Sequence, residues 1–172
     1  MTEPLTAPAS AGIPARAYVA LGANLGDAVA SVRYAFDLLD QLPASRVVAR
    51  SSLYRTAPVG VAGQPDYINA VAALDTLLPP DELLAALLAL ETRQGRTRDF
   101  RHAPRTLDLD LLLHGDARVQ QPGLELPHPR MHQRAFVLVP LAEITPALDI
   151  PGYGPIADLL PQVAAQAIAR IG

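Results

Sequence analysis

Residues 104–115 constrain the fold of this chain most, because they combine the alternation of a strand with a pair of acids. From Thr106 onward, polar and apolar residues alternate, which places leucines on one face of an extended segment and aspartates on the other. The leucines are Leu107, Leu109 and Leu111, and the acids are Asp108 and Asp110. Neighbours two apart on a strand lie roughly 6 to 7 Å apart at Cα, so both carboxylates can reach one cation or a close pair of cations. The segment predicts a strand with a core face and a metal-binding face.

The alternative for a lone Asp-x-Asp pair is an exposed edge strand whose acids are solvated. The preceding segment favours a ligand site instead, because it is rich in arginine. Guanidinium groups bind phosphate oxygens through paired hydrogen bonds, and carboxylates bind the metal ions that accompany polyphosphates. The arginines concerned are Arg93, Arg96, Arg98, Arg101 and Arg105. Acids beside fixed cations predict a site for a polyphosphate with its metal.

The 14 basic residues of the chain are all arginine. A Gly-rich phosphate loop requires its lysine, so that class of nucleotide site is excluded. Eight of the arginines and all four histidines fall within residues 93–134, although the whole chain carries a net charge of −3. A general nucleic-acid binder would carry a basic field over much more of its surface. The charge pattern therefore favours a local anionic ligand and no nucleic-acid partner.

The length of 172 residues is that of one domain with a sizeable core. Residues 1–16 lack the basic and apolar regions of a secretion signal and predict a disordered leader, followed by a single domain over residues 17–172. The longest apolar runs, such as residues 83–90, fall short of a membrane span. Without cysteine there is neither a disulfide framework nor a thiolate metal site. We expect a cytoplasmic monomer without a membrane partner.

The order of the predicted elements indicates the fold class. Residues 17–21 predict a strand, which a glycine-bearing turn joins to a helix with Asp27 as its N-cap. Strands over residues 46–54 and 67–76 follow, then a helix over residues 79–94 whose leucines we interpret as core, and then the Asp-x-Asp strand. This order predicts an α+β fold, namely a ferredoxin-like split β-α-β sandwich with a βαββαβ core. A loop is predicted over residues 120–133, and extra C-terminal helices are predicted from residue 136 to 144 and from residue 156 to 171.

A loop rich in proline and glycine joins the second and third predicted strands and ends at Tyr67 and Asn69. Such a loop can form a wall and a hydrogen-bonding floor for a flat ring, and an ordinary long hairpin loop fits the same residues.

His128 and His132 have a spacing found in zinc sites, but Pro129 disturbs the helix that this spacing requires. We expect His114 and His132 to be structural or exposed to solvent.

Several motifs occur together in one order. The most specific are Pro104-Arg105-Thr106-Leu107-Asp108-Leu109-Asp110-Leu111 and Leu126-Pro127-His128-Pro129-Arg130-Met131, the latter followed by Arg134 and Phe136. Supporting motifs are Leu21-Gly22-Ala23-Asn24-Leu25-Gly26-Asp27, Ser52-Leu53-Tyr54-Arg55-Thr56, Gln64-Pro65-Asp66-Tyr67-Ile68-Asn69-Ala70, and Glu91 with Gly95-Arg96-Thr97-Arg98. In these motifs the chain resembles the 6-hydroxymethyl-7,8-dihydropterin pyrophosphokinase family, from about Tyr18 to about Pro146.

The resemblance implies an ATP- and Mg-dependent diphosphokinase of folate biosynthesis. Such an enzyme transfers pyrophosphate from ATP to the hydroxymethyl group of 6-hydroxymethyl-7,8-dihydropterin and releases AMP. The resemblance further implies two Mg²⁺ ions on Asp108 and Asp110, with Arg96 and Arg105 acting beside these acids in catalysis. The residues implied for ATP are Glu91, Arg96, Arg98, Arg101, Arg105, Leu111, His128 and Arg134. The residues implied for the pterin are Thr56, Ala57, Val59, Tyr67, Asn69 and Phe136.

Some members of that family carry Trp-Gly just before the Pro-Arg-Thr motif, where this chain has His102 and Ala103.

Two other functions stay open at this point. A two-metal nucleotidyltransferase also combines a glycine turn with Asp-x-Asp, but there the two motifs lie close in sequence and the released product is pyrophosphate. A non-catalytic ferredoxin-like module that binds metal or nucleic acid would bind without turnover.

Overall fold

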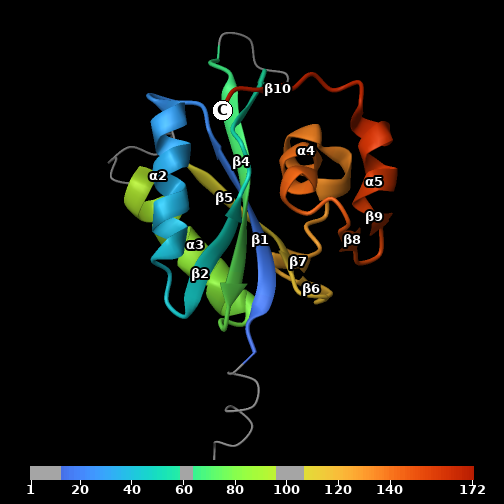
Figure 1. Cartoon of the computed structure of the whole chain (residues 1–172). Helices are drawn as coiled ribbons and strands as arrows, with labels where there is room; N and C mark the ends of the chain where they lie inside the picture. The colour runs from blue at the N-terminus through green and yellow to red at the C-terminus, as the bar shows by residue number, and fades with distance from the viewer. Residues whose placement is uncertain (1–12, 59–63, 96–106) are drawn as a thin grey trace, which may run out of the picture.

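One antiparallel sheet organises the molecule, with strands β1 and β4 at its centre (Figure 1). The computed structural model describes residues 13–58, 64–95 and 107–172. The strands follow the order β10-β3-β4-β1-β5, and β2 also pairs with β4. Their bounds are β1 (Ala15–Ala23), β2 (Ser45–Arg50), β3 (Tyr54–Thr56), β4 (Tyr67–Thr76), β5 (Asp108–His114) and β10 (Ala169–Arg170). Strand β5, which carries the two aspartates, therefore forms one edge of this sheet.

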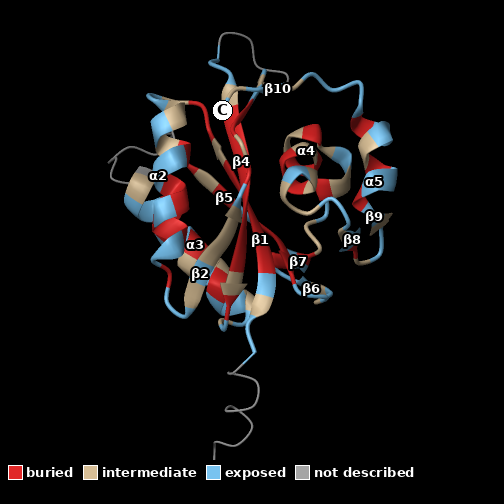
Figure 2. Ribbon diagram, viewed as in Figure 1, coloured by how far each residue is buried: buried red, intermediate tan, exposed pale blue. Residues whose placement is uncertain are grey.

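Helices cover both faces of the sheet and create two cores (Figures 1 and 2). On one face lie α2 (Ala28–Asp40) and α3 (Pro80–Gly95); on the other lie α4 (Ala135–Ile144), α5 (Ile156–Leu159) and the 3-10 helix η2 (Leu160–Val163). Alternate residues of a strand point to opposite faces. Val19 and Leu74 accordingly pack with α2 and α3, whereas Val71 and Leu113 pack with α4 and α5.

Most of the predicted elements are confirmed. Strand β4 spans the predicted residues 67–76, and β1 begins at Ala15, two residues before the expected strand. Asp27 caps α2 as predicted, because its Oδ1 accepts the N–H of Ala30 at 3.0 Å. The structure thus confirms a fold that mixes helices with an antiparallel sheet.

The second predicted strand, residues 46–54, is divided in the structure. Its first part forms β2, and its last residue begins β3. Arg50 pairs with Ala72 and Tyr54 pairs with Asn69, so four steps along one strand match three steps along β4. The extra residue is a bulge, which interrupts the ladder and turns the strand locally. Ser51 bridges the interruption, because its N–H donates to the carbonyl oxygen of Val71 at 2.9 Å and its Oγ accepts the N–H of Val71 at 2.8 Å.

The predicted final helix over residues 156–171 is wrong beyond its first two turns. Helix α5 ends at Leu159, η2 ends at Val163, and Ala169 and Arg170 form strand β10. Pro161 has no N–H to continue an α-helical ladder, which favours the tighter 3-10 turn. Leu159 and Val163 are buried in the core beside α4, and only the chain beyond them reaches the edge of the sheet, where β10 pairs with β3. The N–H of Ile171 extends this pairing by donating to the carbonyl oxygen of Leu53 at 2.8 Å.

The segment after β5, predicted as a loop from residue 120 to 133, contains a small hairpin and a helical turn. The hairpin pairs β6 (Val119–Gln121) with β7 (Leu124–Leu126), and the turn is the 3-10 helix η1 (Met131–Gln133). A second two-stranded ribbon joins β8 (Asp149–Ile150) to β9 (Gly154–Pro155). Within the described ranges, the helices are too short or too polar to cross a bilayer.

Candidate active site

A row of paired residues crosses the sheet at the end where the predicted site residues lie. Asp108 of β5 pairs with Gly22 of β1, Gly22 pairs with Asn69 of β4, and Asn69 pairs with Tyr54 of β3. Directly paired residues of antiparallel strands project from the same face. With strands about 4.8 Å apart, the Cα atoms of Asp108 and Asn69 are about 10 Å apart. A Cβ atom on Gly22 would lie 3.4 Å from Oδ1 of Asn69, so glycine keeps the space between the acid and the amide open.

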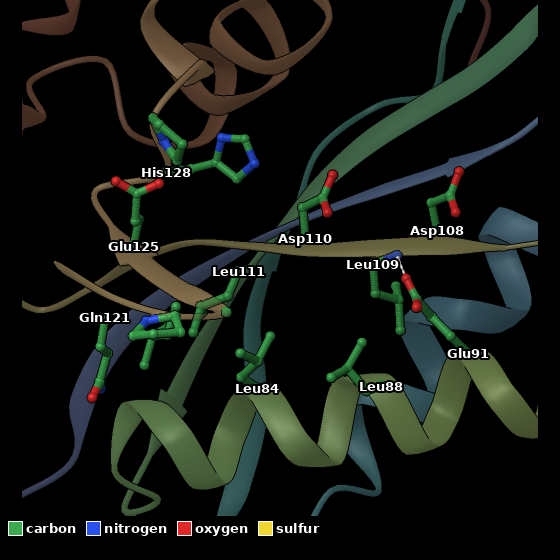
Figure 3. Close-up of a pocket in the computed structure, with 14 residues that line it drawn as sticks. Leu84, Leu88, Glu91, Asp108, Leu109, Asp110, Leu111, Gln121, Glu125 and His128 are labelled. Carbon is green, nitrogen blue, oxygen red and sulfur yellow. Dashed lines mark hydrogen bonds between the residues drawn. The ribbon is translucent and has the colours of Figure 1, made fainter. Parts of the chain in front are cut away.

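Asp108 and Asp110 point away from the leucine core, as the alternation predicts. Leu107, Leu109 and Leu111 are buried, whereas Asp110 is exposed and Asp108 is partly exposed. Figure 3 shows the two carboxylates on one side of β5 and helix α3 on the other. The prediction of two acids on one strand face is confirmed.

Glu91 ties helix α3 to strand β5. Its Oε2 accepts the N–H of Leu109 at 2.6 Å, a bond drawn in Figure 3, and the residue is only 7% exposed. A hydrogen bond to an ionised carboxylate is stronger than a neutral one. Glu91, which the resemblance assigns to ATP, thus holds the strand that carries Asp108 and Asp110.

His128 follows β7 and lies on the same side of β5 as Asp110 (Figure 3). The backbone N–H of His128 donates to the carbonyl oxygen of Leu112 at 2.9 Å, which attaches the residue to β5. Burial lowers the pKa of His128; Asp110 opposes this effect, while Arg134 and Arg130 add to it. The ring Nδ1 accepts the N–H of Arg130 at 3.2 Å, so a neutral ring carries its hydrogen on Nε2. The ring can therefore donate one hydrogen bond without being charged.

The described residues implied for the pterin lie on or just beyond β3, on β4 and in the first turn of α4. Asn69 is 5% exposed, and its Nδ2 donates to Oγ1 of Thr56 at 2.9 Å. Tyr67 pairs with Thr56 and shares its sheet face, while Ala57 is exposed just beyond β3. Phe136 packs against the core beneath α4.

Arg134 connects the two implied sets of residues. Its guanidinium carbon lies 5.4 Å from the centroid of the Phe136 ring, within the range of a cation–π contact. It also contributes to the electrostatic environment of His128. A residue implied for ATP and one implied for the pterin are therefore in contact at the start of α4.

A pocket of about 520 Å³ runs along β5 between α3 and the β6–β7 hairpin (Figure 3). Acidic and apolar side chains share its walls, which include five of the predicted site residues. The lining residues are Leu84, Leu88, Glu91, Asp108, Leu109, Asp110, Leu111, Gln121, Pro122, Gly123, Leu124, Glu125, His128 and Pro129. One elongated space thus joins the aspartate face to an apolar surface.

Part of this lining was not predicted. We interpret the leucines of this helix as core, and Leu84 does pack against the core, although it is only half-buried. Leu88 is 50% exposed, and both leucines line the pocket. They lie four residues apart, on a stripe beside that of the buried Leu83 and Leu87. Splitting the leucines into two stripes would have separated the fully buried pair from the pair that reaches the pocket. The hairpin residues had no comparable signal, because their segment was interpreted as a loop.

The acid pair fits a magnesium ion that is bound together with phosphate. Among residues 13–58, 64–95 and 107–172, no group of three histidine, cysteine or acidic side chains could hold a metal ion. Mg²⁺ prefers oxygen ligands, and one or two carboxylates suffice because water and phosphate complete its shell. Asp108 and Asp110 supply such oxygens, whereas a structural zinc site would require four protein ligands.

Several predicted residues lie outside the described part of the chain. They are Val59, Arg96, Arg98, Arg101 and Arg105, together with His102.

Of the other histidines, His114 is buried with its Nε2 2.8 Å from the carbonyl oxygen of Leu78, which is a structural role. His132 stacks on Tyr153, with ring centroids 4.1 Å apart.

Comparisons with known proteins agree with this arrangement. A family model described as 7,8-dihydro-6-hydroxymethylpterin-pyrophosphokinase matches residues 18–146. The chain is 47% identical over 156 residues to the 2-amino-4-hydroxy-6-hydroxymethyldihydropteridine pyrophosphokinase of Pseudomonas aeruginosa, covering 91% of this chain and 96% of that protein. Enzymes of the same name from Haemophilus influenzae and Bacillus subtilis are 45% and 46% identical, over 86% and 74% of this chain and 92% and 77% of their own.

The fold is also similar to that of solved structures. A chain described as Plasmodium falciparum HPPK-DHPS aligns with a TM-score of 0.68 at 13% identity, covering 87% of this chain. The alignment spans 44% of that longer chain, so the likeness concerns less than half of it. The family match decides in favour of pyrophosphoryl transfer and against the two other functions that the sequence left open. The chain belongs to the 7,8-dihydro-6-hydroxymethylpterin-pyrophosphokinase family, and its reaction is pyrophosphoryl transfer to a hydroxymethyldihydropterin in folate biosynthesis.

Proposed function

We propose that ATP donates the pyrophosphoryl group, that it binds along the β5 pocket with two Mg²⁺ ions at Asp108 and Asp110, and that AMP is released. The row that places Asp108 and Asn69 on one sheet face, with only Gly22 between them, is the observation that carries this proposal. A pterin held at Asn69 would direct its hydroxymethyl group along this row towards the aspartates. Donor and acceptor would then meet over β1.

The chemistry requires one bond to form and one to break. The hydroxymethyl oxygen attacks the β-phosphorus of ATP, and the bond from that phosphorus to the oxygen bridging it to the α-phosphate breaks. The hydroxyl proton passes to solvent, and AMP leaves with the bridging oxygen. Because this transfer needs little covalent help from a protein, positioning and charge stabilisation account for most of the catalysis.

Separate sets of the described residues would bind the pterin and the ATP. Asn69 offers an amide edge to the pterin, and Phe136 offers a ring face for stacking. The Nε2–H of His128 and the guanidinium of Arg134 can donate to phosphate oxygens, while Leu84, Leu88 and Leu111 supply an apolar wall for the flat base. Bound at Asp108 and Asp110, Mg²⁺ would neutralise charge on the phosphate oxygens. Arg96, Arg98, Arg101 and Arg105, from the segment outside the described residues, are proposed to add further phosphate contacts.

We assign the fold to the ferredoxin-like class. Support comes from the element order β1-α2-β2/β3-β4-α3-β5, together with a sheet in which β1 lies between β4 and β5. In this description α4, α5, η2 and β10 are additions that cover the second face. A monomer and a cytoplasmic location are also proposed, and size-exclusion chromatography and cell fractionation would test them.

The test is a product assay with ATP, Mg²⁺ and 6-hydroxymethyl-7,8-dihydropterin. We expect AMP and the pterin diphosphate to form in equal amounts, and AMP to be absent when either the pterin or the metal is left out. Release of ADP would indicate single phosphoryl transfer, and release of pyrophosphate would indicate nucleotidyl transfer. Either product would contradict the proposal.

A further inference from the structure

Glu143 of helix α4 accepts three hydrogen bonds from the segment around the start of β3. Its Oε1 accepts the N–H of Ser52 at 2.9 Å and the O–H of Tyr54 at 2.7 Å, and its Oε2 accepts the Oγ–H of Ser52 at 2.8 Å. Arg170 of β10 lies 3.8 Å from the same Oε2. One carboxylate therefore joins α4, the bulged strand and the C-terminal strand.

The partners of Glu143 lead directly to the pterin-binding face. Tyr54 pairs with Asn69, and Thr56, two residues further along β3, accepts the hydrogen bond from that amide. Strand β3 is only three residues long and follows a bulge, so its own ladder is short. Besides its short ladders with β4 and β10, the three hydrogen bonds to Glu143 anchor its start to α4.

Helix α4 also links Glu143 to Phe136. Phe136 and Glu143 are seven residues apart on α4, which places them on one helix face about 10 Å apart along the axis. Fixing Glu143 against Tyr54 therefore also fixes where Phe136 stands relative to β3 and β4. The proposed stacking ring and the proposed amide edge would be held in one frame.

The electrostatics agree with a tight contact. Burial raises the pKa of Tyr54 to about 12, and the hydrogen bond to Glu143 adds to this effect. Burial alone would raise the pKa of Glu143, but the hydrogen bonds from Tyr54 and Ser52 outweigh it and lower the pKa below the usual value. Arg170 adds little, because its side chain is 64% exposed and the pair is long. The carboxylate is thus held by neutral donors.

We propose that Glu143 is a positioning residue for the pterin, which sets the distance between the Asn69 edge and the Phe136 face without touching the substrate. This inference rests on the proposed function, because it needs the pterin at Asn69. Losing the carboxylate would loosen β3 from α4 and leave the Tyr54 hydroxyl without its acceptor. Pterin binding would weaken, while the β5 pocket, on the far side of β1, would keep its affinity for ATP.

The test compares kinetic constants of Glu143→Ala, Glu143→Gln and Tyr54→Phe. For Glu143→Ala we expect the pterin KM to rise roughly tenfold, with the ATP KM unchanged within about twofold. Glutamine can still accept from Tyr54 and Ser52, so Glu143→Gln should rescue most of the loss. Tyr54→Phe, which keeps the carboxylate and its Ser52 bonds, should raise the pterin KM by a factor of about two to five.

Two control variants separate positioning from general destabilisation. Asp37→Ala removes a carboxylate of α2, on the opposite face of the sheet, that pairs with Arg50 of β2. Thr76→Val removes a buried hydroxyl that contacts Ser45 and Leu78 at the far end of β4. Both should leave the pterin KM unchanged, and Thr76→Val should lower Tm.

The kinetic results distinguish a failure of the Glu143 inference from a failure of the proposed function. An active wild type whose Glu143→Ala variant keeps the pterin KM within about twofold would overturn the inference alone. Parallel changes in both KM values that track Tm, as a purely structural residue would give, would overturn it as well. Should Glu143→Ala fail to fold, an unchanged pterin KM in Tyr54→Phe would have the same meaning. A wild type that forms no AMP with the pterin would overturn the proposed function and this inference together.

Discussion

Replacing Asn69 by alanine is expected to weaken pterin binding selectively. The side chain is 5% exposed and has one donor engaged with Thr56 at 2.9 Å. An amide nitrogen carries two hydrogens, so a second donor and the carbonyl oxygen can meet the edge of a ring. The variant would leave the polar edge of a bound pterin unpaired in a largely buried place, at a cost of about 1 to 3 kcal/mol. The pterin KM should therefore rise about 5- to 150-fold.

The effect on the fold should be much smaller. Asn69→Ala removes one hydrogen bond within the protein, worth about 1 kcal/mol net, which lowers Tm by about 2 to 4 °C in a chain of this size. Steady-state kinetics with the pterin varied at saturating ATP, and then with ATP varied at saturating pterin, would measure the selectivity. Asn69→Asp is the companion variant, because it keeps the shape and an acceptor but loses both amide hydrogens.

Thr76→Val is the matched control for this experiment. It lies on the same strand β4, is 1% exposed, and likewise loses a buried polar group that makes hydrogen bonds. We expect it to lower Tm by a similar amount while both KM values stay at the wild-type level. Equal weakening of ATP and pterin in Asn69→Ala, or an unchanged pterin KM, would refute the assignment of Asn69 to the pterin.

Asp108→Asn and Asp110→Asn should each abolish Mg²⁺-dependent turnover, because each removes a carboxylate from the proposed metal site; near-normal activity in both would remove the metal assignment. Asp110→Asn should not lower Tm in metal-free buffer, because it relieves repulsion from the neighbouring carboxylate. Gly22→Val should lower turnover while the protein stays folded by circular dichroism, since its Cβ would already lie 3.4 Å from Oδ1 of Asn69 and its branches would fill the space towards Asp108; full activity would show that this space is unused. The raised pKa of Tyr54, from 10.0 to about 12, means that between these pH values the unfolded chain loses a proton that the folded protein keeps. Stability should therefore fall as pH rises from 10 to 12, and Tyr54→Phe should lose less over that range in denaturant titrations; equal losses would contradict the buried phenol.

The sequence could predict those parts of the fold whose signal is local. The alternation around Asp108 and Asp110 revealed both the strand and its polar face, and Asp27 marked the start of α2. Strand β3 was merged with β2, because a bulge depends on how a strand pairs with β4 and leaves no mark in the hydrophobic pattern. The C-terminal error has the same origin: Ala169 and Arg170 pair with the distant residues Arg55 and Tyr54, which helical spacing cannot reveal.

In the functional site, too, local motifs were predictable from the sequence and long-range contacts were not. Residue types and motifs pointed to Asp108, His128 and Asn69, because their chemistry is specific. The row through Gly22 that relates the acid to the amide depends on the register of three strands, which no single stretch of sequence contains. Glu143 was missed for the same reason, since its partners Ser52 and Tyr54 are about ninety residues away in the chain.

A structure of the protein with a non-hydrolysable ATP analogue, Mg²⁺ and 6-hydroxymethyl-7,8-dihydropterin is the most direct test of the central claim. We predict that the metal is bound by Asp108 and Asp110, that the pterin edge is paired with Asn69, and that the hydroxymethyl oxygen points over Gly22 towards the β-phosphorus. A pterin bound away from Asn69, or phosphates bound away from the aspartate face of β5, would contradict the account.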